Sequence, residues 1–180
     1  MTKTPLLEQA LHKKQLVKFT RSFDEGSVNG YILDIGPKFF LIALVEDASR
    51  FNGFQCIRVS DVRNLHAPDK NSLFVETALK KLNRKMPSKP RLKLETVATI
   101  LASANAVFPL VTIHREQADP GICHIGLVKD VNRTHVSLLE IGMDASWDKR
   151  PTEHKLSEIT RIDFGGNYEE ALHLVGGIPD

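Results

Sequence analysis

The segments GYILDI, residues 30–35, and GLVKDV, residues 126–131, decide the fold because they show that the chain contains one structural unit twice. The segments VSDV, residues 59–62, and LSEI, residues 156–159, follow in the same order at nearly the same offset. Self-similarity at a fixed spacing is the mark of a repeated architecture. The chain has 180 residues, so each copy has roughly 70 to 90 residues, enough for a small domain. We therefore predict two tandem domains.

Around these segments, the hydrophobic pattern predicts a helix followed by five strands in each copy. In the first copy we expect a helix at 5–14, a polar loop at 47–53, a 3₁₀ turn at 60–61, and strands at 16–22, 28–35, 39–45, 54–58 and 62–65. In the second copy we expect a helix at 94–106 and strands at 111–115, 122–131, 135–141, 154–156 and 160–164. Further helices are predicted at 73–83 and 168–175. The fold class is therefore mainly β, with two five-stranded barrels that are each preceded and followed by a short helix.

The segment between the two copies has the composition of a basic linker. Residues 80–93 contain seven basic side chains, two prolines and no acidic side chain. We predict a first helix-barrel-helix unit at 1–79, this linker at 80–93, and a second unit at 94–180.

The bulk composition favours a globular protein of ordinary kind. Hydrophobic residues make up 42% of the chain and charged residues 26%, while the net charge of +2 is too small to indicate nucleic-acid binding by itself. Cys56 and Cys123 lie in apolar strand patterns without zinc-ligand spacing, which predicts two buried, reduced thiols. No run approaches the roughly 20 apolar residues of a membrane span, and the N-terminus has no apolar signal segment. We expect a cytoplasmic protein without membrane contact.

A helix followed by five antiparallel strands, with glycine in the second strand, resembles the Sm-like branch of the SH3-like small barrels. Residues 57–62, IRVSDV, are similar to the IRGDNI-type segment that Sm proteins carry before the last strand. Val59 and Leu156 stand where the family has glycine, and Asp34 and Asp130 follow their glycines too closely to match its usual aspartate. The family's RNA-contacting asparagine is absent from the first copy, whereas Asn132 lies near that position in the second.

A second resemblance is to uncharacterised bacterial proteins. It is carried by FPLVTIHRE, residues 108–116, and ITRIDFGGNYEEAL, residues 159–172. The resemblance implies a bacterial origin and no particular activity.

The basic linker and the turns at which Sm-like barrels present their ligand surface are the candidate nucleic-acid site. Cations neutralise phosphates, and aromatic or imidazole rings stack on bases. The candidates are Lys38, Phe39, Arg58, Lys80, Lys81, Arg84, Lys85, Arg133, His135 and Lys155. We expect RNA or single-stranded DNA as the ligand; the alternative for the linker is a solvated spacer.

Other polar groups have a structural interpretation beside a functional one. Arg21 and Arg115, at equivalent positions, can bind an anion or close the barrel, with Asp24 or Glu25 as partners of Arg21. Asp34 and Asp130 are expected to accept turn N–H groups. The segment 114–116, HRE, offers a base or half a metal site, but a polar strand edge explains it as well. We find no catalytic motif, and predict no enzyme activity, no cofactor and no metal.

The alternative function is a protein-interaction or self-association module. Small barrels pair through strand edges, and Phe51, Phe54 and Trp147 lie in predicted loops. These aromatic side chains either stand exposed as binding knobs or fold back onto the barrel mouth. Salt sensitivity distinguishes the two functions, because nucleic-acid binding weakens with salt and an aromatic interface does not.

Overall fold

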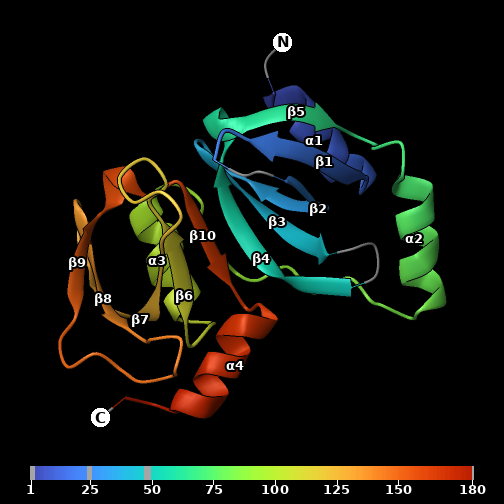
Figure 1. The fold of residues 1–180 in the computed structure, drawn as a ribbon. Helices are drawn as coiled ribbons and strands as arrows, with labels where there is room; N and C mark the ends of the chain where they lie inside the picture. The colour runs from blue at the N-terminus through green and yellow to red at the C-terminus, as the bar shows by residue number, and fades with distance from the viewer. Residues whose placement is uncertain (1–2, 24–25, 47–49, 180) are drawn as a thin grey trace. The chain divides into compact units, whose positions relative to one another are not determined.

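In the residues that the structure describes, ten strands and four helices form two units that repeat one topology (Figure 1). The computed structural model describes residues 3–23, 26–46 and 50–179. The chain divides into residues 1–89 and residues 90–180, a boundary that falls inside the predicted linker. Each unit is described by itself.

The first unit is an antiparallel sheet between two helices. Strand β1 pairs with β2 and β5, and the strand order is β5-β1-β2-β3-β4. The elements are α1 (Thr4–Lys13), β1 (Leu16–Arg21), β2 (Ser27–Ile35), β3 (Phe39–Glu46), β4 (Arg50–Arg58), the 3₁₀ turn η1 (Val59–Asp61), β5 (Val62–His66) and α2 (Ser72–Lys81).

The second unit repeats this arrangement in the order β10-β6-β7-β8-β9. Its elements are α3 (Val97–Asn105), β6 (Val111–His114), β7 (Cys123–Val131), β8 (His135–Glu140), β9 (Thr152–Lys155), the 3₁₀ turn η2 (Leu156–Glu158), β10 (Arg161–Phe164) and α4 (Asn167–Gly176). The predicted element order is thus confirmed in both units.

The prediction that each five-stranded sheet closes into a barrel is wrong. Among the described residues no ladder joins β4 to β5 or β9 to β10, so within each unit these strands are the two ends of the sheet. Closure depends on strand tilt and stagger, which a pattern of apolar residues does not specify. Residues 50–53, predicted as loop, begin β4 instead.

Alternation along the strands places the core on both faces of the first sheet. Val17 and Phe19 pack with α1, whereas Leu16 packs with Val75 and Leu79 of α2. In the second unit, Leu172 of α4 packs with Leu110, Ile125 and Ile141. Each helix therefore covers apolar strand residues of its own unit.

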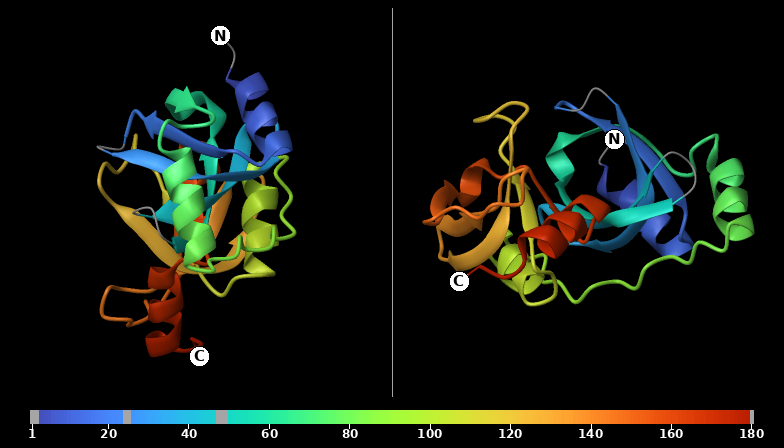
Figure 2. Two further views of the ribbon diagram at one scale, coloured as in Figure 1. Left: turned by 90° about the vertical axis from the view of Figure 1, so that its right-hand side faces the viewer. Right: turned by 60° about the horizontal axis from the view of Figure 1, so that its bottom comes forward.

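The segment that follows α2 has no regular secondary structure. Lys80 and Lys81 lie in the last turn of α2. Residues 84–94 form an irregular, mostly exposed segment (Figure 2). No helix among the described residues is long and apolar enough to cross a bilayer.

The cysteine prediction is half correct. Cys56 is buried in β4, but Cys123 is exposed. Cys123 is the first residue of β7, next to an exposed loop, so the sheet does not cover its side chain. Both thiols are free.

The glycines that align in the repeat lie where the neighbouring strand leaves no room for a side chain. A Cβ at Gly30 would lie 2.3 Å from the carbonyl oxygen of Ala43, and a Cβ at Gly126 would lie 2.2 Å from that of Leu139. A register shift follows in both units, between Ile32 and Asp34 and between Val128 and Asp130. Only glycine fits this approach, which explains why the repeat retains it.

We predict that Gly30→Ala and Gly126→Ala each lower the free energy of unfolding by about 2 to 3 kcal/mol, because a backbone carbonyl cannot move aside as a side chain can. Urea denaturation measures this loss. Gly26→Ala is the matched control, since no atom of the described residues lies within 4 Å of its Cβ position. Equal stability of the three variants would contradict the packing argument.

Candidate functional site

In each unit the turn after the second strand meets the 3₁₀ turn before the last strand. The N–H of Val59 donates to the carbonyl of Lys38 at 2.9 Å, and the N–H of Leu156 donates to that of Thr134 at the same distance. Phe39 pairs with Arg58 across β3 and β4, as His135 pairs with Lys155 across β8 and β9. The structure thus brings the predicted turn residues together as two equivalent sets, one in each unit.

In the second unit these turns enclose a pocket of about 340 Å³, lined by Arg133, Thr134, His135, Lys155, Leu156 and Ser157. The Oδ1 of Asn132 accepts hydrogen bonds from the N–H groups of Thr134 at 2.8 Å and His135 at 2.9 Å. This Asx turn fixes the backbone that carries the pocket.

The polar side chains of this pocket are available to a ligand. Arg133 and Lys155 are exposed, and the Lys155 side chain retains 63% of its accessible surface. Its Nζ lies 3.6 Å from Glu158, an ion pair that solvent screens. His135 is half-buried, with Nδ1 2.9 Å from the Thr134 hydroxyl. The pocket therefore presents two cations and an imidazole.

At the equivalent turns of the first unit, Phe39 occupies the position that His135 has in the second unit. Lys38 is exposed, but Phe39 is only 3% exposed, so its ring cannot stack on a base. Phe39 begins the apolar run of β3, whose first five residues are all buried. The Nε of Arg58 lies 3.6 Å from Asp61, a partner within the 3₁₀ turn.

Lys89 of the basic segment, residues 80–93, contacts the turn that follows β2 in the first unit. The Nζ of Lys89 donates to Oδ2 of Asp34 at 2.7 Å, at the end of β2. Oδ1 of Asp34 accepts the N–H of Ile35, which is the turn role expected for this aspartate. Lys80, Lys81, Arg84 and Lys85 are exposed.

The two units carry charges of opposite sign. Residues 1–89 hold 15 Lys and Arg against 9 Asp and Glu, a net +6, whereas residues 90–180 hold 9 against 13, a net −4. The small net charge of the chain therefore conceals a strongly basic first unit, whose field favours anionic partners.

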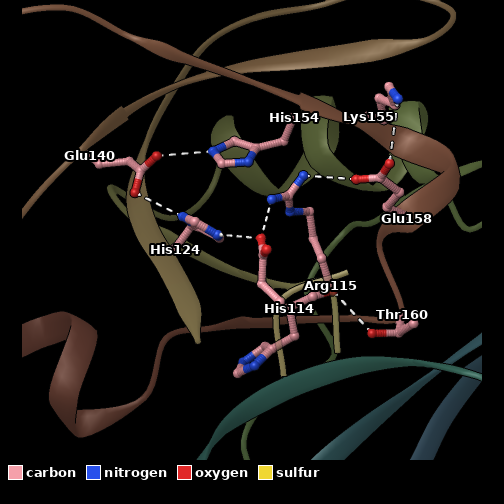
Figure 3. A network of polar contacts seen from close by, with 9 residues as sticks. His114, Arg115, His124, Glu140, His154, Lys155, Glu158 and Thr160 are labelled. Carbon is pink, nitrogen blue, oxygen red and sulfur yellow. Dashed lines mark hydrogen bonds and ion pairs between the residues drawn. The ribbon is translucent and has the colours of Figure 1, made fainter. Parts of the chain in front are cut away.

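A second group of polar side chains forms a continuous network in the second unit (Figure 3). It begins at Lys155, whose partner Glu158 accepts a 2.8 Å hydrogen bond from Arg115. Arg115 also pairs with Asp119, which lies 3.4 Å from Nε2 of His124.

The network ends at Glu140, between two histidines. Its Oε2 lies 3.0 Å from Nδ1 of His124, and its Oε1 lies 2.9 Å from Nε2 of His154. His154 is 2% exposed, while His124 and Glu140 are half-buried. Potential ligand atoms of these three residues lie within 4.8 Å of one another, so they can hold a metal ion.

Two carboxylates of this network, Glu140 and Asp119, have pKa values below the usual range. Burial raises the pKa of Glu140, but the combined hydrogen bonds and positive charges of His154 and His124 outweigh it and hold the pKa low. The Arg115 hydrogen bond is the main cause that lowers the pKa of Asp119, and His124 adds to it. Glu140 and Asp119 are therefore anions at neutral pH.

The sequence did not predict this group, because its members come from β7, β8 and β9 and have no short spacing. The nearest prediction was the segment 114–116. In that segment, a ring nitrogen of His114 lies 3.0 Å from a carboxylate oxygen of Asp163 in β10. Arg115 forms ion pairs with Asp119 and Glu158, which is the structural interpretation of this arginine.

The remaining candidates pack within their units. Arg21 is buried, with its guanidinium 5.5 Å from the centre of the Phe23 ring; its predicted partners, Asp24 and Glu25, lie outside the described residues. Phe54 is buried, and Phe51 packs against Tyr31. The Nε1 of Trp147 donates to the Gly176 carbonyl at 2.9 Å. Phe51 and Phe54 thus lie in β4, and all three aromatic side chains pack onto their own units.

Comparisons with models of known protein families, with curated proteins and with solved structures find no match to this chain.

We predict that Arg115→Gln lowers the urea midpoint at pH 7, and that the difference from the wild type shrinks below about pH 4. An aspartate whose pKa is lowered by folding contributes stability above its unfolded pKa of about 3.9, and this contribution is lost as the pH falls through the lowered value. Denaturation curves from pH 7 to pH 2 measure it. Arg150→Gln, in the exposed loop between β8 and β9, is the control. A constant difference at every pH would contradict the assignment.

Proposed function

We propose that this protein binds single-stranded nucleic acid, RNA above all, and acts without catalysing a reaction. The observation that carries the proposal is the meeting of two turns in each unit, which gathers Lys38 with Arg58 and Arg133 with His135 and Lys155. Repeated use of one turn pair is what a chain that contacts successive nucleotides requires.

The charge distribution supports a division of roles between the units. The first unit, with net charge +6 and the exposed cations of the basic segment, supplies phosphate contacts. The pocket of the second unit has room for a base edge, with His135 beside it and two cations around it. Phosphate contacts give affinity, whereas the pocket gives preference among nucleotides.

The resemblance to Sm-like small barrels agrees with this assignment. The leading helices α1 and α3, the second-strand glycines and the 3₁₀ turns η1 and η2 are the features on which the resemblance rests. In that family the same turns present the ligand surface. We therefore propose that each unit is a distant, open variant of the Sm-like barrel.

We predict that fluorescence anisotropy detects saturable binding to labelled single-stranded RNA, weaker binding to single-stranded DNA and the weakest to duplex. Replacing Lys80, Lys81, Arg84 and Lys85 by Gln should reduce the slope of log K against log salt by about 3, and Arg133→Gln with Lys155→Gln should reduce it by about 1.4, at about 0.7 for each lost phosphate contact. Neither change should alter thermal stability much, since all six side chains are exposed.

The matched control is Lys149→Gln with Arg150→Gln, two exposed cations in the loop between β8 and β9. This control removes two positive charges, as the pocket variant does. Its residues precede β9, whereas Lys155 is the last residue of that strand. Equal loss in control and pocket variant would mean that the pocket has no special role. The absence of binding by the wild type at low salt would refute the proposal.

One observation favours the alternative of a protein-interaction module. Leu174 and Val175 on α4, together with Ile178 after it, are 75–85% exposed. Apolar side chains in such a group are typical of interaction surfaces. An association that persists at high salt and is lost on replacing these side chains by Ser would support this alternative.

A further inference from the structure

The geometry points to a divalent transition-metal site of the zinc type, formed by His124, Glu140 and His154. This site is separate from the nucleic-acid pocket and does not depend on the proposed function. Three neighbouring strands supply it: His124 lies in β7, Glu140 ends β8 and His154 lies in β9. A bound ion would therefore cross-link these three strands.

The distances suit a single ion. Glu140 oxygens already lie 2.9 Å and 3.0 Å from the histidine nitrogens, and the ligand atoms all fall within 4.8 Å of one another. Zinc bonds of about 2.0 to 2.2 Å in tetrahedral geometry place ligand atoms roughly 3.3 Å apart. The three side chains can reach that arrangement by small rotations, without movement of the strands.

The donor set selects the kind of metal. Two imidazole nitrogens and one carboxylate favour zinc and its neighbours over calcium or magnesium, which prefer oxygen ligands. Three protein ligands leave the fourth position of a tetrahedral ion for water or a small ligand.

The surroundings of His124 match those of a metal-binding histidine. When Nδ1 binds an ion, Nε2 carries the proton and needs an acceptor, and Asp119 lies 3.4 Å away. Arg115 pairs with Asp119, and Arg115 is itself anchored to Glu158. This chain of contacts positions a carboxylate behind the ring, as in many zinc sites.

The contacts around Glu140 also suit a cation. In the part of the chain that the structure describes, the side-chain partners of Glu140 are the two histidines, and no Lys or Arg pairs with it. Nδ1 of His154 is buried and has no hydrogen-bond partner among the described residues, whereas Nε2 faces Glu140 at 2.9 Å. Nε2 is therefore the nitrogen that His154 presents to an ion.

The test uses the full chain without an affinity tag, treated with EDTA and dialysed. Co²⁺ is titrated as the visible-absorption probe, and Zn²⁺ is then added in competition. We expect one Co²⁺ per chain with d–d bands of tetrahedral intensity, displacement of Co²⁺ by Zn²⁺, and a thermal midpoint that rises with Zn²⁺ because only the folded state presents the three ligands.

Variants assign the ligands. His124→Gln and His154→Gln should each weaken Zn²⁺ binding by at least about 100-fold, and Asp119→Asn by about 10- to 100-fold through its hold on His124. His66→Gln, an exposed histidine of β5, should leave the affinity unchanged. Because His154 is buried, its variant is interpreted only when its circular dichroism matches the wild type; the half-buried His124 carries the test otherwise.

The proposal would be overturned by any of three results. One is a wild-type chain that takes up no Co²⁺ or Zn²⁺ at one ion per chain. Another is uptake that His124→Gln and Glu140→Gln, both folded, retain at wild-type affinity. Uptake that disappears only in His66→Gln would likewise assign the ion to another site.

Discussion

The close approach of two backbones at Gly30 and at Gly126 is the constraint on which each unit depends. A side chain at either position would overlap with a backbone carbonyl oxygen of the neighbouring strand, that of Ala43 or that of Leu139. The register shift a few residues later then changes the pairing at the end of the same strand. Bulges of this kind bend a strand and increase its twist. In both units the turn after this strand is hydrogen-bonded to the 3₁₀ turn.

The meeting of turns brings together segments that are distant in sequence. A backbone hydrogen bond, from Val59 to Lys38 in the first unit and from Leu156 to Thr134 in the second, joins the two turns. The same frame carries different side chains in the two units: the first contributes a buried Phe39, the second a half-buried His135. The two units also carry net charges of opposite sign, so one topology presents two different surfaces.

The polar network of the second unit has no counterpart in the repeat pattern. At the positions of His124 and His154, the aligned strands of the first unit carry Val28 and Ile57, both apolar. A histidine in a core needs a polar partner, and Glu140 supplies one to both rings. The second unit thus carries a polar cluster where the first unit has apolar side chains, and buried ion pairs of this kind add little to stability by themselves.

The sequence alone predicts the repeat, the order of helices and strands, the glycine positions and the charge of the linker, because these follow from local periodicity and composition. Only the folded structure shows that the sheets stay open within each unit, that Phe39 is buried, that Cys123 is exposed, and that His124, Glu140 and His154 converge. These properties depend on the twist and curvature of the sheets, which set the side chains that meet across three strands. No spacing along the chain encodes such a meeting.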